Sequence, residues 1–140
     1  IAALVKARET LDKLSADQEL WIGGGLQTGG DFAKALSLGA DAIFCGTALL
    51  IAMGCTNCRL CYLGKCPKGI ATQDLELREK INIEEASQNI ANYINNCTEE
   101  IKMVAGAVGK DDIHNLAKDD LRALTSEMAK ISGAEFIGAK

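Results

Sequence analysis

The spacing of apolar and polar positions predicts alternating helices and strands in the first third of the chain. Leucines fall on one side of an amphipathic helix over residues 1–15, with charged residues between them. Residues 19–23 (ELWIG) and 41–45 (DAIFC) predict two short, buried strands, with helices at about 29–38 and 48–53. The order helix, strand, helix, strand, helix with short connections indicates parallel strands in an α/β sheet or barrel.

Local signals refine the ends of the second helix. Thr28 and Asp31 have the spacing of a capping box, and Gly39 is placed to end the helix. Two strands cannot close a sheet, so we expect further strands outside this sequence, in the same chain or in another. Ile1 falls inside a helical pattern, which also leads us to expect a longer protein.

The second half of the sequence has a helical period and predicts packing rather than chemistry. Apolar residues recur at spacings of three and four over one long helix: Ile83, Ala86, Ile90, Ile94, Cys97, Ile101, Val104 and Val108. A turn around Ile113 follows. We expect a last helix over 121–131, opened by Asp119 and Asp120 and closed by Gly133.

Composition and charge exclude several classes of protein. The 140 residues carry a net charge of −4, which gives nucleic acid no electrostatic reason to bind. The sequence shows neither an apolar run of membrane-spanning length nor a basic and apolar leader, so we expect a cytoplasmic protein with no membrane partner. Six cysteines in that compartment indicate metal or redox chemistry rather than disulfides.

Two glycine turns stand where the predicted strands end. Gly24, Gly25 and Leu26 follow the first strand, and Gly46 and Thr47 follow the second. In a parallel βα barrel such turns bring backbone amides close to a phosphate group, which a Cβ atom would keep away. The alternative is that the glycines merely allow tight turns. The spacing does not match the dinucleotide or Walker glycine motifs.

The loop after the third helix holds four cysteines within twelve residues: Cys55, Cys58, Cys61 and Cys66. Thiolates at this spacing can ligate an iron–sulfur cluster, and a proline after the last cysteine also occurs in bacterial ferredoxins. Arg59 and Lys65 would offset the negative charge. A zinc site and a disulfide are the alternatives; structural zinc usually takes cysteine pairs farther apart.

The order of these motifs closely resembles the synthase domain of glutamate synthase. The residues that carry the resemblance are GGGLQTGGDFAKALSLGADAIFCGTALLIAMGC followed by CRLCYLGKCPKGIATQD, and the similarity extends more loosely to DIHNLAKDDLRAL. It implies the C-terminal portion of a parallel (β/α)8 TIM-type barrel over 1–54. It also implies a cluster loop over 55–75 and a helical segment over 76–140 that packs on the barrel.

The resemblance also implies an activity, cofactors and partners. The family converts glutamine and 2-oxoglutarate into glutamate. Ammonia from a glutaminase domain or subunit forms 2-iminoglutarate, which receives hydride from reduced FMN. An iron–sulfur cluster, 3Fe-4S in the family, relays electrons from an NAD(P)H-oxidising subunit or ferredoxin. The implied partners therefore include the rest of the barrel, and this chain alone is expected to be inactive.

Carried over residue by residue, the resemblance places FMN phosphate contacts on Gly24, Gly25, Gly46 and Thr47. The three cluster ligands fall at Cys55, Cys61 and Cys66. The chain departs from the family pattern at Cys58, which leaves 4Fe-4S open, and at Gln27, where many relatives carry arginine.

Three hypotheses remain at this point. The leading one is a fragment of glutamate synthase, for which no catalytic residue is assigned within this sequence. The second is a ferredoxin-like electron-transfer module without substrate chemistry, and the third is a zinc-stabilised interaction domain. His114, Trp21, Cys45 and Cys97 are expected to serve surface, capping or packing roles.

Overall fold

A computed structural model describes residues 1–138, so the last two residues of the expected segment 76–140 lie outside it. The chain forms two compact units: Ile1–Cys45 with the residues from Cys97 onward, and Gly46–Asn96. The boundary between Asn96 and Cys97 falls inside helix α5. This helix spans Ile83–Ala107 and confirms the long helix that the apolar period predicts. The expected division at residues 54 and 75 stays a prediction.

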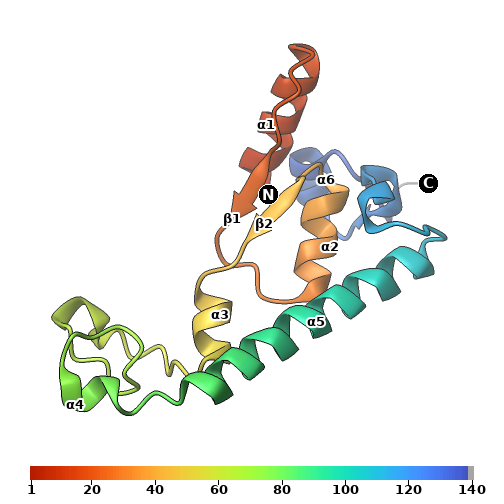
Figure 1. The fold of residues 1–140 in the computed structure, drawn as a ribbon. Helices are drawn as coiled ribbons and strands as arrows, with labels where there is room; N and C mark the ends of the chain where they lie inside the picture. Colours follow the sequence, from red (N-terminus) through yellow and green to blue (C-terminus); the bar gives the residue numbers. More distant parts are fainter. Residues whose placement is uncertain (139–140) are drawn as a thin grey trace. The chain divides into compact units, whose positions relative to one another are not determined.

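The first unit begins with two helices and a pair of parallel strands. These elements are α1 (Ala2–Lys13), β1 (Trp21–Gly23), α2 (Gly29–Ser37) and β2 (Ala42–Phe44). In the parallel register Trp21 pairs with Ala42 and Gly23 with Phe44. Figure 1 shows β1 and β2 side by side, with α2 next to them. The expected helix, strand, helix, strand order is confirmed.

The core of this unit lies between the helices and one face of the β1–β2 pair. Five buried residues form it: Leu4, Val5, Ala35, Leu38 and Ala40. Ile22 and Ile43 pack against them from the strands. The alternate strand positions face the other side, where Trp21 is 52% and Phe44 60% exposed. The expectation that both strands are buried is therefore wrong for that face, because α1 and α2 cover one side of the pair.

Trp21 and Phe44 contact each other on the exposed face. Their ring centroids lie 5.1 Å apart with the planes tilted by 54°. Trp21 therefore packs, as its position in the first strand predicts.

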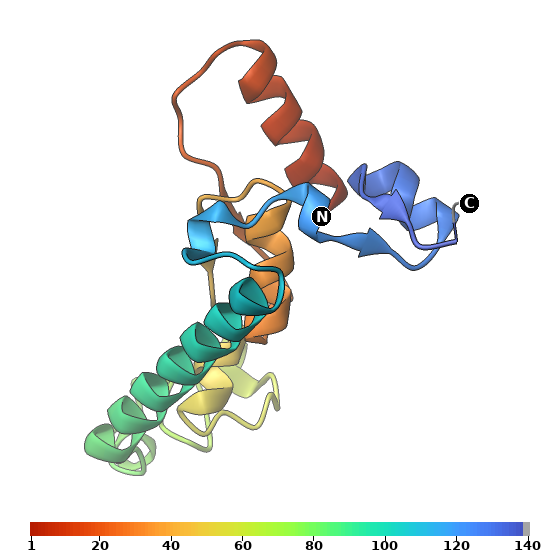
Figure 2. The same ribbon diagram turned by 90° about the vertical axis from the view of Figure 1, so that its right-hand side faces the viewer.

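The C-terminal part of the first unit differs from the sequence expectation. Two 3₁₀ turns, two short strands and one helix follow α5: η2 (Ile113–Asn115), η3 (Lys118–Asp120), β3 (Arg122–Ala123), α6 (Ser126–Ser132) and β4 (Glu135–Phe136). A single helix over 121–131 is wrong because residues 122–123 are extended and pair in parallel with 135–136. The helix begins after Thr125, whose Oγ1 accepts from the Met128 N–H at 3.1 Å. Figure 2 shows α6 beside the N-terminal end of α1.

The second unit contains short elements before the first half of α5. They are α3 (Thr47–Ala52), the 3₁₀ turn η1 (Leu60–Leu63) and α4 (Leu75–Arg78). The expected third helix corresponds to α3, whereas α4 was not predicted. Asp74 caps α4 by accepting from the Leu77 N–H at 3.1 Å.

Taken together, helices and parallel strand pairs confirm the α/β class at this level of detail. Within residues 1–138, none of the helices is long and apolar enough to span a bilayer.

Candidate functional site

The first glycine turn leaves β1 with its backbone accessible. Gly24 and Gly25 are exposed and have φ angles of +117° and +73°, in the region that glycine adopts most readily. A Cβ added at either glycine would meet no atom within 4 Å. Leu26 is half-buried and packs against the core, which fixes the far side of the turn. The turn therefore presents its main chain to open space next to a residue that is packed on the core.

The N-terminus of α2 is capped as the sequence predicts. Thr28 Oγ1 accepts from the Asp31 N–H at 3.2 Å, and Asp31 Oδ2 accepts from the Thr28 N–H at 3.3 Å. Asp31 Oδ2 also accepts from the Gln27 N–H at 3.2 Å. This backbone hydrogen bond, supported by Lys34 and Thr28, lowers the pKa of the Asp31 carboxyl, although partial burial opposes it.

Because the pKa of Asp31 is lowered in the folded state, its contribution to stability is present near neutral pH. It is lost as pH falls below the ordinary value of 3.8. We expect Asp31→Asn to destabilise α2 by about 1 kcal/mol near pH 7, with the difference shrinking in acid. Hydrogen exchange of residues 29–38 at stepped pH measures this effect, and exposed Asp17→Asn is the control. A difference that persists in strong acid contradicts the assignment.

Gly29 brings α2 against α5 within the first unit. This glycine is buried, and its N–H donates to Glu100 Oε2 at 2.7 Å. A Cβ here would collide with Glu100 Cβ and would lie 2.6 Å from the Cys97 carbonyl oxygen. The contact joins residues 71 positions apart, so no local sequence pattern pointed to it.

Gly29→Ala is expected to destabilise the fold by about 2–4 kcal/mol, because the added methyl has no space and displaces a hydrogen-bonded carboxylate. Gly30→Ala is the matched control. Its Cβ would find Thr28 Oγ1 at 3.7 Å, an ordinary contact, and alanine favours helix by up to about 1 kcal/mol. Thermal unfolding compares the two variants, and an equal effect of both contradicts the close α2–α5 packing.

The second glycine turn follows β2 directly. Gly46 and Thr47 are exposed, and a Cβ at Gly46 would meet no atom within 4 Å. Gly46 has a φ of −112° and a ψ of −81°, a combination outside the main α and β regions. Gly23 pairs with Phe44 in the parallel sheet, so the chain leaves both strands at the same edge. Gly24 is one residue beyond that edge and Gly46 is two.

The four loop cysteines differ in exposure. Cys55 is half-buried, with the Asn57 N–H directed at its Sγ at 3.4 Å. Cys58 and Cys61 are exposed, whereas Cys66 is 7% exposed. Across residues 1–138, no three His, Cys, Asp or Glu side chains converge in an arrangement that could hold a metal ion.

Cys66 lies in a turn whose backbone amides stabilise its thiolate. A hydrogen bond from the Ala71 amide has the largest effect and lowers the pKa of the Cys66 thiol. The amides of Lys68, Ile70 and Gly69 add to it, while burial acts in the opposite direction. Amide donors of this kind are typical around cluster-ligating sulfurs. The cysteine sulfurs of the loop, and the amides around Cys66, are therefore suited to a group that is bound through thiolates.

Gly69 allows the Cys66 turn to close. Its N–H donates to the Cys66 carbonyl at 3.1 Å, and its φ is +74°. A Cβ would collide with the Leu77 carbonyl oxygen and lie 3.3 Å from the Arg78 carbonyl oxygen. The Cys-Pro-x-Gly pattern is thus a β-turn packed against α4, a role that the sequence reading did not assign to Gly69.

Polar contacts brace the rest of the loop. The Thr72 hydroxyl donates to the Gly64 carbonyl oxygen and accepts from the Asp74 N–H at 3.1 Å. Arg59 and Gly64 flank η1 in left-handed conformations. The segment after Cys66 therefore supports the segment before it.

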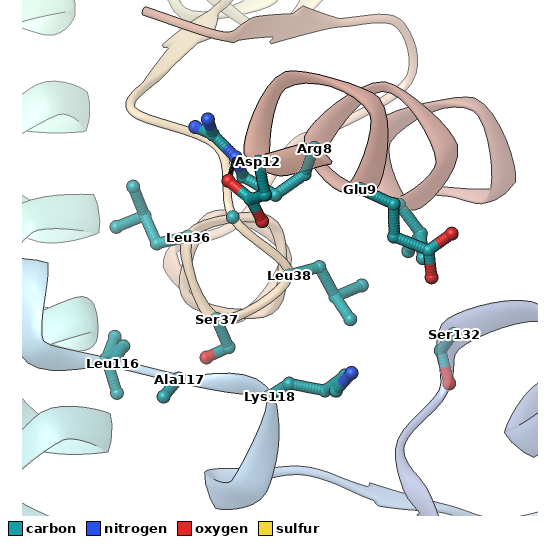
Figure 3. Close-up of a pocket in the computed structure, with 12 residues that line it drawn as sticks. Arg8, Glu9, Asp12, Leu36, Ser37, Leu38, Leu116, Ala117, Lys118 and Ser132 are labelled. Atoms are coloured by element: carbon teal, nitrogen blue, oxygen red, sulfur yellow. Dashed lines mark hydrogen bonds and ion pairs between the residues drawn. The ribbon is translucent and has the colours of Figure 1, made fainter. Parts of the chain in front are cut away.

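A cavity of about 330 Å³ in the first unit lies away from the glycine turn, at the C-terminal end of α2 (Figure 3). Arg8 lines it and pairs with Asp12 Oδ1 at 2.9 Å and Asp41 Oδ2 at 3.4 Å. Asp41 also accepts from the Leu20 N–H at 2.6 Å. These contacts tie α1 to the starts of both strands, so we give this cavity a structural role.

The remaining side chains considered in the sequence are accounted for by packing and turns. His114 is exposed and its Nδ1 lies 2.9 Å from Asp112 Oδ1. This pairing, led by the His114 backbone N–H, lowers the pKa of Asp112. Cys97 is buried, as expected, and Cys45 is half-buried.

Comparison with known proteins identifies the family of this chain. Residues 1–111 match the family described as the conserved region in glutamate synthase. The chain belongs to the glutamate synthase family, which confirms the resemblance seen in the sequence.

Individual relatives extend this result. An archaeal-type glutamate synthase (NADPH) of Dehalococcoides mccartyi is 37% identical over 140 residues, covering 97% of this chain and 28% of that protein. The protein of the same name from Thermotoga maritima is 44% identical over 95 residues, covering 68% and 19%. A ferredoxin-dependent glutamate synthase of Pyropia yezoensis is 41% identical over 95 residues, covering 67% and 6%. The chain thus spans less than two thirds of the length of each of these curated relatives.

Proposed function

We propose that this chain supplies the last two strands of an FMN-binding (β/α)8 barrel and the adjoining iron–sulfur loop of a glutamate synthase. The observation that carries the proposal is the parallel register of β1 and β2, because both glycine turns then begin at the same edge of the sheet. The cysteine loop follows the second turn within ten residues. Membership in the glutamate synthase family supports the same reading.

The glycine turns are proposed to hold the phosphate of FMN. Amides of Gly24, Gly25 and Leu26 donate from the first turn, and Gly46 with the Thr47 hydroxyl donates from the second. The open space at the three glycines is the support, because a Cβ there would fill the position of the anion. These groups bind and orient; no catalytic residue is assigned in this chain.

The thiolates of Cys55, Cys61 and Cys66 are proposed to hold a 3Fe-4S cluster, with Cys58 as the additional donor of a 4Fe-4S alternative. The amides around Cys66 support its role as a thiolate ligand. Between Asp41 and Asp74 the sequence has no acidic residue, whereas Arg59, Lys65 and Lys68 lie there. This local positive charge suits a negatively charged cluster.

When bound, the flavin supplies hydride transfer and the cluster supplies single electrons. The complete protein is proposed to act in the cytoplasm, transferring the amide nitrogen of glutamine to 2-oxoglutarate. Its partners are a glutaminase domain or subunit, the rest of the barrel, and an NAD(P)H-oxidising subunit or ferredoxin. The names of the relatives include both classes of electron donor.

Glutamate formation by the complete protein tests this proposal. With glutamine, 2-oxoglutarate and a reduced donor, two glutamates are expected for each two-electron oxidation, and omitting 2-oxoglutarate abolishes donor oxidation. Iron and sulfide without bound FMN, and without glutamate formation, favour the electron-carrier alternative.

A further inference from the structure

A carboxylate from a distant helix occupies the N-terminus of α2. Glu100, on α5, accepts the Gly29 N–H at 2.7 Å, and both residues belong to the first unit. The close backbone approach at Gly29 is possible because this position has no Cβ. The contact therefore holds the start of α2 at a defined place.

Negatively charged side chains meet the first-turn amides of α2. Asp31 accepts from the Gln27 and Thr28 amides, and Glu100 accepts from Gly29. A phosphate dianion placed at this helix terminus would meet two carboxylates, which outweighs the favourable end of the helix dipole. The N-terminus of α2 is therefore a poor phosphate site, and the anion is directed toward the preceding turn.

The preceding turn is fixed at three points. Gly23 is held in the β1–β2 ladder, Leu26 packs into the core, and Gly29 donates to Glu100. The exposed backbone of Gly24 and Gly25 lies between the first two points, in conformations that favour glycine. A turn fixed beforehand loses less conformational entropy when it binds an anion.

We propose that Glu100 is a positioning residue for the phosphate-binding turn. Its carboxylate oxygen fixes Gly29, and through Gly29 the amides of Gly24, Gly25 and Leu26. This inference rests on the proposed flavin-phosphate function. It extends that function by giving the long helix α5 a part in flavin binding.

The test compares FMN with riboflavin, which lacks the phosphate, on the complete protein depleted of flavin. Flavin fluorescence gives both affinities for the unmodified protein and for Glu100→Ala, Glu100→Asp and Glu100→Gln. Alanine removes the acceptor, aspartate keeps the charge but shortens the reach, and glutamine keeps an acceptor oxygen without the charge. Glu99→Gln is the matched control, since Glu99 is exposed and pairs with Lys102 at 2.7 Å.

Glu100→Ala and Glu100→Asp are expected to weaken FMN binding roughly tenfold while leaving riboflavin binding unchanged. Glu100→Gln and Glu99→Gln are expected to keep the FMN to riboflavin ratio of the unmodified protein. A general loss of structure lowers both affinities equally, so parallel losses overturn the positioning role. An unchanged ratio in Glu100→Ala and Glu100→Asp also overturns it.

Failure of the underlying function gives a different result. If the unmodified protein binds FMN and riboflavin equally well, the phosphate turn itself is wrong. If the unmodified protein prefers FMN and both Glu100→Ala and Glu100→Asp keep that preference, only the role of Glu100 is wrong.

Discussion

Replacing Cys66 with alanine is expected to reduce the iron content of the complete protein to background. Cys66 is the buried thiol of the loop, and the amide of Ala71 leads the donors that favour its thiolate. Loss of this sulfur removes the ligand that the amides of the turn orient. Iron and acid-labile sulfide, measured per chain, check the result.

Cys45→Ala is the control for this prediction, because Cys45 is a half-buried cysteine outside the loop. It is expected to keep its iron. Retention of iron and sulfide in Cys66→Ala contradicts the cluster assignment.

Cys58 decides the type of cluster. For the proposed 3Fe-4S cluster, Cys58→Ala leaves the iron content unchanged, whereas a fall from four irons to three indicates that Cys58 is a ligand. Electron paramagnetic resonance of the oxidised protein provides an independent reading of the cluster type.

Gly46→Asp is expected to weaken FMN binding by at least about a hundredfold. A unit charge ~4 Å from a phosphate charge costs about 4 kcal/mol at an effective dielectric constant near 20, and solvent reduces this figure. An added side chain at Gly46 meets no atom within 4 Å, and any backbone cost at its φ of −112° and ψ of −81° is shared by the Gly46→Asn variant.

Gly46→Asn separates charge from shape. Asparagine has nearly the size of aspartate, so it shows the loss that the added side chain causes without a charge, and FMN affinity is expected to fall less than in Gly46→Asp. Titration of the flavin-depleted complete protein measures both variants. Equal losses in the two variants show that the added negative charge has no effect of its own and contradict a bound anion at this turn.

Elements with local signals were predictable from the sequence. The capping box of Thr28 and Asp31 is formed as its spacing predicts, and Gly39 follows α2 with a positive φ. The long α5 follows from its apolar period. In each case the determining residues lie within a few positions of one another, so the pattern is visible in the sequence.

Features that depend on distant contacts were not predictable. Glu100 reaches Gly29 across 71 residues, and nothing in either neighbourhood indicates the pair. The two-residue strands β3 and β4 exist because they pair with each other. The sequence predicts a helix there because the apolar residues around 121–131 have a helix-like spacing. Exposure of Trp21 and Phe44 was missed because a short apolar run does not show whether one or both faces are covered.

The candidate site was partly accessible from the sequence. The glycine turns and the four cysteines were found from spacing, and the structure adds the open space at the glycines and the amide turn at Cys66. The role of Gly69 was missed, although the Cys-Pro-x-Gly pattern carries a β-turn signal that could have indicated it.

The content of FMN, iron, sulfide and zinc in the complete, anaerobically purified protein tests the central claim most directly. We expect one FMN per chain together with three irons and four sulfides, or four irons if Cys58 is a ligand. Zinc in place of iron, with neither sulfide nor flavin, would contradict it.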